Sequence, residues 1–118
     1  NGNLTIRVVG SAMSSAAVIL QAGDVRELTP NSSVMYHPGT SGLESTPTPE
    51  SETMWRFWKQ MNKRCDDIVH ERMVRSSGRN ISATQFRTIV IRGLVGIGSK
   101  AVALGLADYV IGEYSNEI

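Results

Sequence analysis

The chain has 118 residues, which is the size of a single domain. Its 12 basic and 11 acidic side chains give a net charge of +1, so the sequence offers no electrostatic basis for binding nucleic acid. No apolar run approaches the roughly 20 residues of a membrane-spanning helix, and the single cysteine, Cys65, excludes an internal disulfide and favours a reducing compartment.

The N-terminal part of the chain predicts strands and helices in alternation. Residues 4–9 are short, β-branched and bounded by glycines, as in a buried strand. Residues 14–22 are small and apolar, which predicts a buried helix that Gly23 stops. Residues 24–32 are predicted to be a polar connection, and residues 33–37 a second short strand.

The middle of the chain predicts a loop followed by one long helix. Residues 38–51 are rich in Pro, Gly, Ser and Thr, which indicates a loop. Residues 52–76 are expected to be helical, with Ser51 as the N-terminal cap. An apolar seam recurs on this helix at spacings of four and three, formed by Met54, Trp58, Met61, Cys65 and Ile68. The helix either faces the core or also packs against a neighbouring subunit.

The C-terminal part predicts a third helix, a fourth helix and a last strand. Ser82 and Gln85 fit a capping box that opens a helix over residues 83–92, which Gly93 ends. A glycine-rich apolar stretch, a short helix and a short strand follow, over residues 94–98, 100–106 and 108–111. The alternation of strands and helices predicts an α/β fold with a partly parallel sheet.

Ser14 and His37 are the candidate catalytic residues. Ser14 lies in a small-residue turn between a strand and a helix, and His37 ends the second strand. These are two of the three parts of a serine hydrolase, because a serine hydroxyl becomes a good nucleophile when a histidine accepts its proton. The structural alternatives are that Ser14 caps a helix and that His37 bonds a backbone carbonyl. Ser15 is the competing nucleophile.

Other residue types give no further candidate site. His70 lies among charged residues on the long helix and is predicted to be a solvated surface residue. Two histidines and one cysteine at unrelated spacings do not form a metal site. The glycines at 93, 96 and 98 are not followed by the Lys-Ser/Thr pair of a nucleotide-binding loop, so no cofactor is expected.

Three segments of the chain resemble the Clp protease proteolytic subunit. They are Gly10–Gly23, Pro30–Pro38 and Lys100–Ile111, in the family's order and near its spacing. The resemblance covers most of the chain. It implies a ClpP/crotonase-like α/β fold, a partial spiral of βα units with a long handle helix at residues 52–76.

The resemblance also implies a chemistry and an assembly. Ser14 matches the family's nucleophile, His37 its general base, and the backbone N–H of Ser15 one donor to the oxyanion. The family's subunits form stacked rings, homo- or hetero-oligomeric, that degrade proteins fed by an ATP-driven unfoldase of the AAA+ class. We therefore expect a cytoplasmic protein, with an organelle or a virus-infected cell as the alternative.

The chain departs from the family pattern in three places. Residues 1–118 match a single domain that corresponds to the family's C-terminal portion, so a complementary N-terminal chain or segment is expected to supply the missing strands, axial loops and second oxyanion donor. The family's catalytic acid falls at residues 92–94, which hold no carboxylate. Asp108 matches a different aspartate, and Asp66 and Asp67 fit poorly. Residues 40–50 replace the family's glycine-containing handle strand.

The leading hypothesis is thus a ring-forming serine endopeptidase that uses Ser14 and His37. The main alternative is a catalytically inactive ring subunit, which the missing acid and the altered handle favour. A weaker alternative is a crotonase-like protein that binds acyl-CoA thioesters, against which the His37 segment argues.

Overall fold

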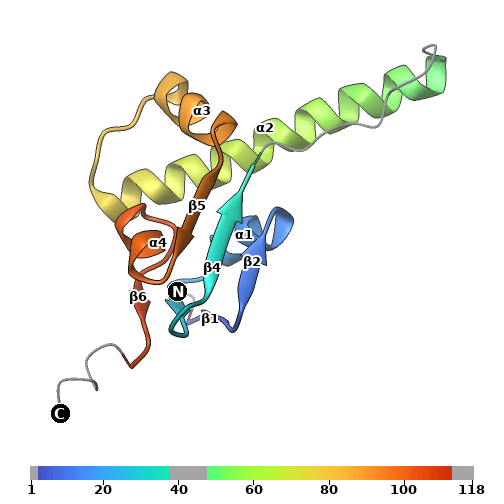
Figure 1. The fold of residues 1–118 in the computed structure, drawn as a ribbon. Coiled ribbons are helices and arrows are strands. Elements are labelled where there is room, and N and C mark those ends of the chain that lie inside the picture. Colours follow the sequence, from blue (N-terminus) through green and yellow to red (C-terminus); the bar gives the residue numbers. More distant parts are fainter. Residues whose placement is uncertain (1–2, 38–47, 113–118) are drawn as a thin grey trace.

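A computed structural model describes residues 3–37 and 48–112. In these ranges short strands alternate with helices around one core (Figure 1). The strands are β1 (Thr5–Val8), β2 (Ser11–Met13), β3 (Val25–Leu28), β4 (Ser33–Tyr36), β5 (Leu94–Ile97) and β6 (Tyr109–Val110). The helices are α1 (Ser15–Leu20), α2 (Pro49–Ser77), α3 (Ala83–Ile91) and α4 (Ser99–Ala103).

The strands form two three-stranded sheets. The first has the order β1-β3-β6 and is entirely parallel. The second has the order β2-β4-β5, in which β2 and β4 are parallel and β4 and β5 antiparallel. The expected α/β fold with a partly parallel sheet is therefore confirmed.

The core lies between the sheets and the helices that cover them. Leu28 of β3 and Val34 of β4 are completely buried, and Val69 and Met73 close the core from α2. Each such side chain stabilises the fold by about 1.5–3 kcal/mol relative to leaving it in water. Where β5 meets α4, a Cβ on Gly96 would lie 2.7 Å from backbone atoms of Ala101, so this close approach requires glycine.

The prediction of a polar connection over residues 24–32 is wrong, because Val25–Leu28 forms the central strand of the first sheet. The side chain of Arg26 is fully buried there. It donates hydrogen bonds to the carboxylate of Asp108, the amide oxygen of Gln21 and the carbonyl of Gly105. This polar segment resembled a loop because two of the partners, Gly105 and Asp108, lie 79 and 82 positions away in the sequence.

Several expected element boundaries also need correction. Residues 11–13 form β2 rather than a turn, and α1 ends at Leu20 rather than at residue 22. Helix α2 begins at Pro49 and is capped by Thr48, while Ser51 is the third residue of the helix and completes a capping box with Thr48. The expected loop is thus wrong over residues 49–51, and its residues 38–47 lie outside the described part of the chain.

The two helices expected in the C-terminal part are present. The capping box of Ser82 and Gln85 opens α3 as predicted. Residues 94–97 form β5, a strand that the sequence pattern did not predict. The short helix expected over residues 100–106 is present as α4 but covers only Ser99–Ala103.

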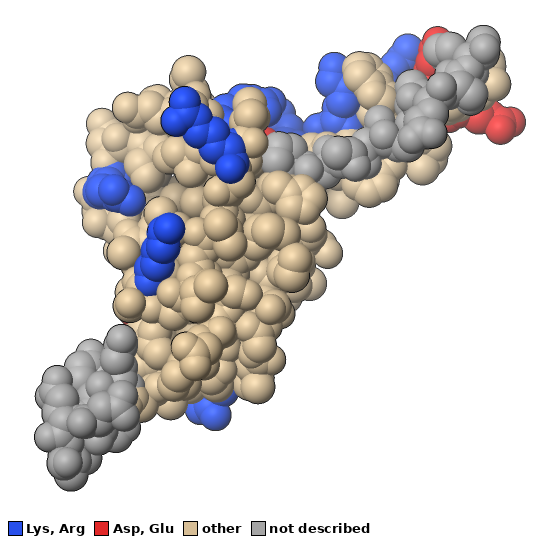
Figure 2. All heavy atoms as spheres, in the orientation of Figure 1, with Lys and Arg blue, Asp and Glu red and all other residues tan. Residues whose placement is uncertain are grey.

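Helix α2 is only partly covered by the rest of the chain. Its C-terminal half contributes Val69 and Met73 to the core, which confirms the core-facing interpretation for this half alone. Its N-terminal half projects away from the sheets, with basic side chains along it and acidic ones near its start (Figures 1 and 2). The large apolar side chains exposed on this half are Met54, Trp55, Phe57, Trp58 and Met61. None of the described helices is long and apolar enough to cross a membrane.

Candidate active site

The structure brings Ser14 and His37 into contact. Strands β2 and β4 are parallel neighbours in which Met13 pairs with Met35, so both strands end at the same edge of the sheet. Ser14 directly follows β2, and its N–H donates to the Met35 carbonyl at 2.9 Å. His37 directly follows β4. The hydroxyl of Ser14 and Nε2 of His37 form a hydrogen bond of 3.0 Å.

Ser14 occupies a sharp turn in an uncommon backbone conformation. Its φ of 56° and ψ of −119° differ from the extended geometry of an ordinary N-cap residue. Its side chain makes no capping hydrogen bond and contacts His37 instead. The interpretation of Ser14 as a helix cap is therefore wrong. A serine in a strained turn between a strand and a helix is typical of an exposed nucleophile.

The chain contains a second turn of the same shape, which carries no side chain. Gly98 joins β5 to α4 with φ 55° and ψ −126°. In both turns the carbonyl of the turn residue accepts hydrogen bonds from two backbone N–H groups of the following helix. The donors are Ala17 and Val18 after Ser14, and Ala101 and Val102 after Gly98. Glycine adopts this backbone conformation without strain, whereas serine is strained in it. The serine therefore occurs in the turn whose side chain contacts His37.

We expect Ser14→Gly to be more stable than Ser14→Ala by about 1 kcal/mol, because glycine relieves the backbone strain that alanine keeps. Urea unfolding measures the difference. Gly98→Ala is the matched control: its added Cβ meets no atom within 4 Å, so it introduces the strain without a clash and should destabilise the protein by about 1–2 kcal/mol. Equal stability of the two Ser14 variants would contradict a strained turn.

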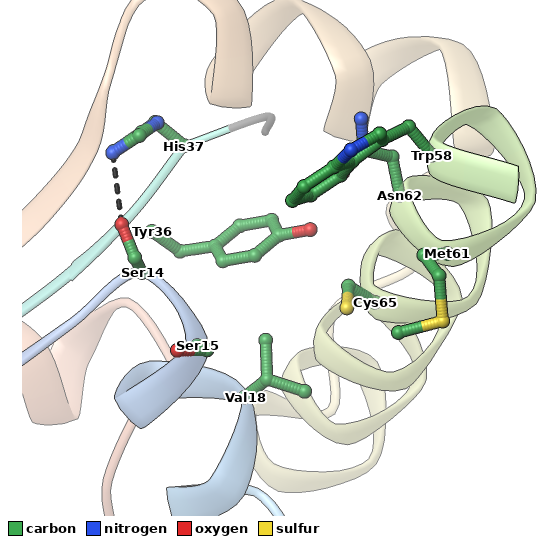
Figure 3. Close-up of a pocket in the computed structure, with 9 residues that line it drawn as sticks. All are labelled: Ser14, Ser15, Val18, Tyr36, His37, Trp58, Met61, Asn62 and Cys65. Carbon is green, nitrogen blue, oxygen red and sulfur yellow. Dashed lines mark hydrogen bonds between the residues drawn. The ribbon is translucent and has the colours of Figure 1, made fainter. Parts of the chain in front are cut away.

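A pocket of about 360 Å³ opens beside the pair (Figure 3). Ser14, Ser15, Val18 and His37 line one side, and α2 forms the opposite wall. The α2 residues in this wall are Trp58, Met61, Asn62 and Cys65. The ring of Tyr36 extends between the two sides (Figure 3). This wall is mainly apolar. The sequence predicted its apolar residues as the seam on the long helix. It did not predict that the seam lies opposite Ser14.

Tyr36 connects the pocket to α2 through a partly buried hydrogen bond that the sequence did not indicate. Its hydroxyl donates to Oδ1 of Asp66 at 2.5 Å. Burial and this bond to the carboxylate raise the pKa of Tyr36 far above its usual value, so the phenol stays protonated. Oδ2 of Asp66 lies 3.7 Å from the guanidinium of Arg87 on α3. The Asp66 carboxylate thus accepts the hydrogen bond of Tyr36. Asp66 was also a poor fit to the family's catalytic acid.

The other carboxylates considered from the sequence have structural partners. Asp67 pairs with Lys63 on the exposed side of α2. Asp108 binds Arg26 in the core network, as expected for an aspartate outside a triad. Residues 92–94, where the resemblance places the acid, adjoin the site because Leu94 pairs with Tyr36 across β4 and β5.

The backbone N–H of Ser15 is at the first position of α1. An N–H at this position has no acceptor within its own helix and is available to a ligand. It directly follows the residue whose hydroxyl contacts His37, which is where one oxyanion donor stands in such turns. Of the two candidate nucleophiles, Ser14 is the one whose hydroxyl bonds to His37.

The prediction of His70 as a solvated surface residue is wrong. Its ring is partly buried, stacks on Phe86 with centroids 4.9 Å apart, and Nε2 lies 2.6 Å from the carbonyl oxygen of Ile81. It therefore ties α2 to the segment that leads into α3. Within residues 3–37 and 48–112, no group of three His, Cys, Asp or Glu side chains could hold a metal ion.

Comparison with protein-family models gives a match over nearly the whole chain. A family model described as Clp protease matches residues 1–114. This range includes every residue of the pocket described above. A search of curated proteins found no match.

Proposed function

Because the chain belongs to the Clp protease family, we propose that it hydrolyses peptide bonds with Ser14 as nucleophile and His37 as general base. Family membership indicates a ClpP-like peptidase, and the mixed α/β architecture agrees with the ClpP/crotonase-like fold. The observation that carries the assignment of residues is the 3.0 Å hydrogen bond between Ser14 and His37 at the mouth of the pocket.

The reaction follows from this geometry. Nε2 of His37 accepts the proton of the Ser14 hydroxyl as Oγ attacks the peptide carbonyl carbon. The carbonyl oxygen becomes an oxyanion that the backbone N–H of Ser15 stabilises. The protonated His37 then gives its proton to the leaving amine, which leaves an acyl group on Ser14. His37 then takes a proton from water, which attacks the acyl carbon. The ester bond to Oγ breaks, His37 returns its proton to Oγ, and the carboxylic acid leaves.

The pocket supports a preference for apolar side chains next to the cleaved bond. Trp58 and Met61 on α2 present apolar surface opposite the pair, and Val18 and Tyr36 add apolar surface to the same pocket. An apolar substrate side chain that fills this space releases water from both surfaces, and each buried CH₂ contributes about 0.8 kcal/mol.

Family proteins typically form oligomeric rings. We propose that this chain joins such a ring, whether homo- or hetero-oligomeric, through the exposed apolar side chains of the N-terminal half of α2. These side chains are large, and Trp55, Phe57 and Trp58 are each at least 40% exposed in the single chain. An AAA+ unfoldase completes the proposed assembly.

A serine-reactive phosphonate probe tests the proposal. The probe is expected to form a covalent adduct, and peptide sequencing by mass spectrometry should locate it on Ser14. Labelling should disappear in Ser14→Ala. Ser11→Ala is the control, because Ser11 lies three residues earlier and its hydroxyl bonds to Ser33, away from His37.

An adduct on Ser15, or labelling that survives in Ser14→Ala, contradicts the assignment of the nucleophile. Assembled protein that takes up no probe supports the alternative of a catalytically inactive ring subunit.

A further inference from the structure

Tyr36 is the last residue of β4 that pairs with a neighbouring strand. It pairs with Leu94 of β5, and the pairing with β2 ends one residue earlier, at Met35. His37 follows immediately, at the point where the strand ladder stops. The orientation of His37 therefore depends on how firmly the backbone of Tyr36 is held.

The side chain of Tyr36 is held by a network that spans three elements. It is 3% exposed, and its hydroxyl donates to Asp66, whose side chain is 14% exposed. A hydroxyl that donates to a carboxylate in so sheltered a place forms one of the stronger hydrogen bonds of a protein. Asp66 belongs to α2 and faces Arg87 of α3. Tyr36 is thus fixed at its backbone by β5 and at its hydroxyl by α2.

We propose that Tyr36, anchored by Asp66, is a positioning residue that fixes His37 in reach of the Ser14 hydroxyl. The inference rests on the proposed function and extends it to residues that touch neither the proton nor the attacked carbonyl. Without the hydroxyl, the Tyr36 ring is no longer fixed to α2, and the strand end can pivot. Misplacement of a catalytic group by about 1 Å costs up to about 100-fold in rate.

The first test compares two tyrosines whose hydroxyls each donate to a carboxylate. Tyr36→Phe keeps the ring in the pocket and removes only the bond to Asp66. Tyr109→Phe removes the same kind of bond, from a phenol to Glu27, in the other sheet. We expect Tyr36→Phe to slow labelling of Ser14 by the phosphonate probe about tenfold, and to lower kcat for a peptide substrate with little change in KM. Tyr109→Phe should label within twofold of the wild type.

A second pair of variants keeps the test decisive if Tyr36→Phe unfolds. Asp66→Asn retains an oxygen that accepts the Tyr36 hydroxyl and should keep most of the labelling rate. Asp66→Ala removes the acceptor and should label as slowly as Tyr36→Phe. Circular dichroism establishes that each variant is folded. Equal rates for Asp66→Asn and Asp66→Ala, or equal losses in Tyr36→Phe and Tyr109→Phe, overturn the inference.

A third measurement is independent of catalysis. The chain has two histidines, so the ¹⁵N signal of His37 Nε2 is readily assigned in a long-range nitrogen–proton spectrum. In Ser14→Ala this nitrogen loses its hydrogen bond and its shift defines the uncoupled state. We expect the shift in Tyr36→Phe to move towards that value, and the shift in Tyr109→Phe to stay at the wild-type value.

These measurements separate failure of the inference from failure of the proposed function. An unchanged Nε2 shift in Tyr36→Phe overturns the positioning role, even if the wild-type protein labels at Ser14. Conversely, the Nε2 shift in Tyr36→Phe can move as expected while the wild-type protein takes up no probe. That outcome supports the positioning role and contradicts the peptidase assignment.

Discussion

Ser14→Ala is expected to lower kcat for peptide hydrolysis by about 10⁴-fold or more, because the variant has no oxygen to form the acyl intermediate. Substrate binding depends on the pocket wall, so KM should change little. The measurement is steady-state hydrolysis of a fluorogenic peptide with an apolar residue before the cleaved bond. The chain is assayed in the assembly in which it is active.

The double variant Ser14→Ala/His37→Ala sharpens this prediction. The two side chains act as one unit, so removing both should cost no more than removing Ser14 alone. His37→Ala by itself should lose nearly as much activity, because the Ser14 hydroxyl then lacks the base 3.0 Å away. Independent, multiplying losses would mean that the two residues do not share a step.

Arg26→Met is expected to reduce the free energy of unfolding by roughly 3–5 kcal/mol, the range for breaking a buried ion pair. The Arg26 side chain is completely buried and donates to Asp108, Gln21, Gly105 and Ser76. Methionine fills much of the space but leaves these acceptors without a donor. Urea unfolding measures the loss.

Lys63→Met is the matched control, because Lys63 and Asp67 form an exposed ion pair on α2. Its expected cost is at most about 0.5 kcal/mol. A comparable loss in both variants would contradict the role given to burial.

Acid should reduce the effect of Arg26→Met. Burial acts to raise the pKa of Asp108, but its hydrogen bonds with Arg26 outweigh burial and hold the pKa below its usual value. Since the folded pKa is lower than the unfolded one, the stabilisation is complete above about pH 4 and is lost as the pH falls through the folded pKa. Wild type and Arg26→Met should therefore converge in stability in acid. A difference that stays constant with pH would show that Asp108 is not the main partner.

Ser14 and His37 could be identified as candidates from the sequence. A serine in a small-residue turn after a strand and a histidine at the end of the next strand have the residue types and local settings of a hydrolase site. Their contact still needed the fold. Residues 23 positions apart meet because β2 and β4 are parallel neighbours in register. A shift of this register by one residue would turn the side chains to opposite faces.

The sequence alone determined the features that depend on local chemistry. The capping box of Ser82 and Gln85, the strand over residues 33–36 and most of α2 follow from side-chain spacing and capping within one or two turns of chain. Only the tertiary structure decided that a charged segment around Arg26 is a central strand, and that Asp66 anchors Tyr36 beside the site. Burial of a charge or a hydroxyl depends on a partner, and these partners lie 30 to 82 positions away along the chain, beyond the reach of any local pattern.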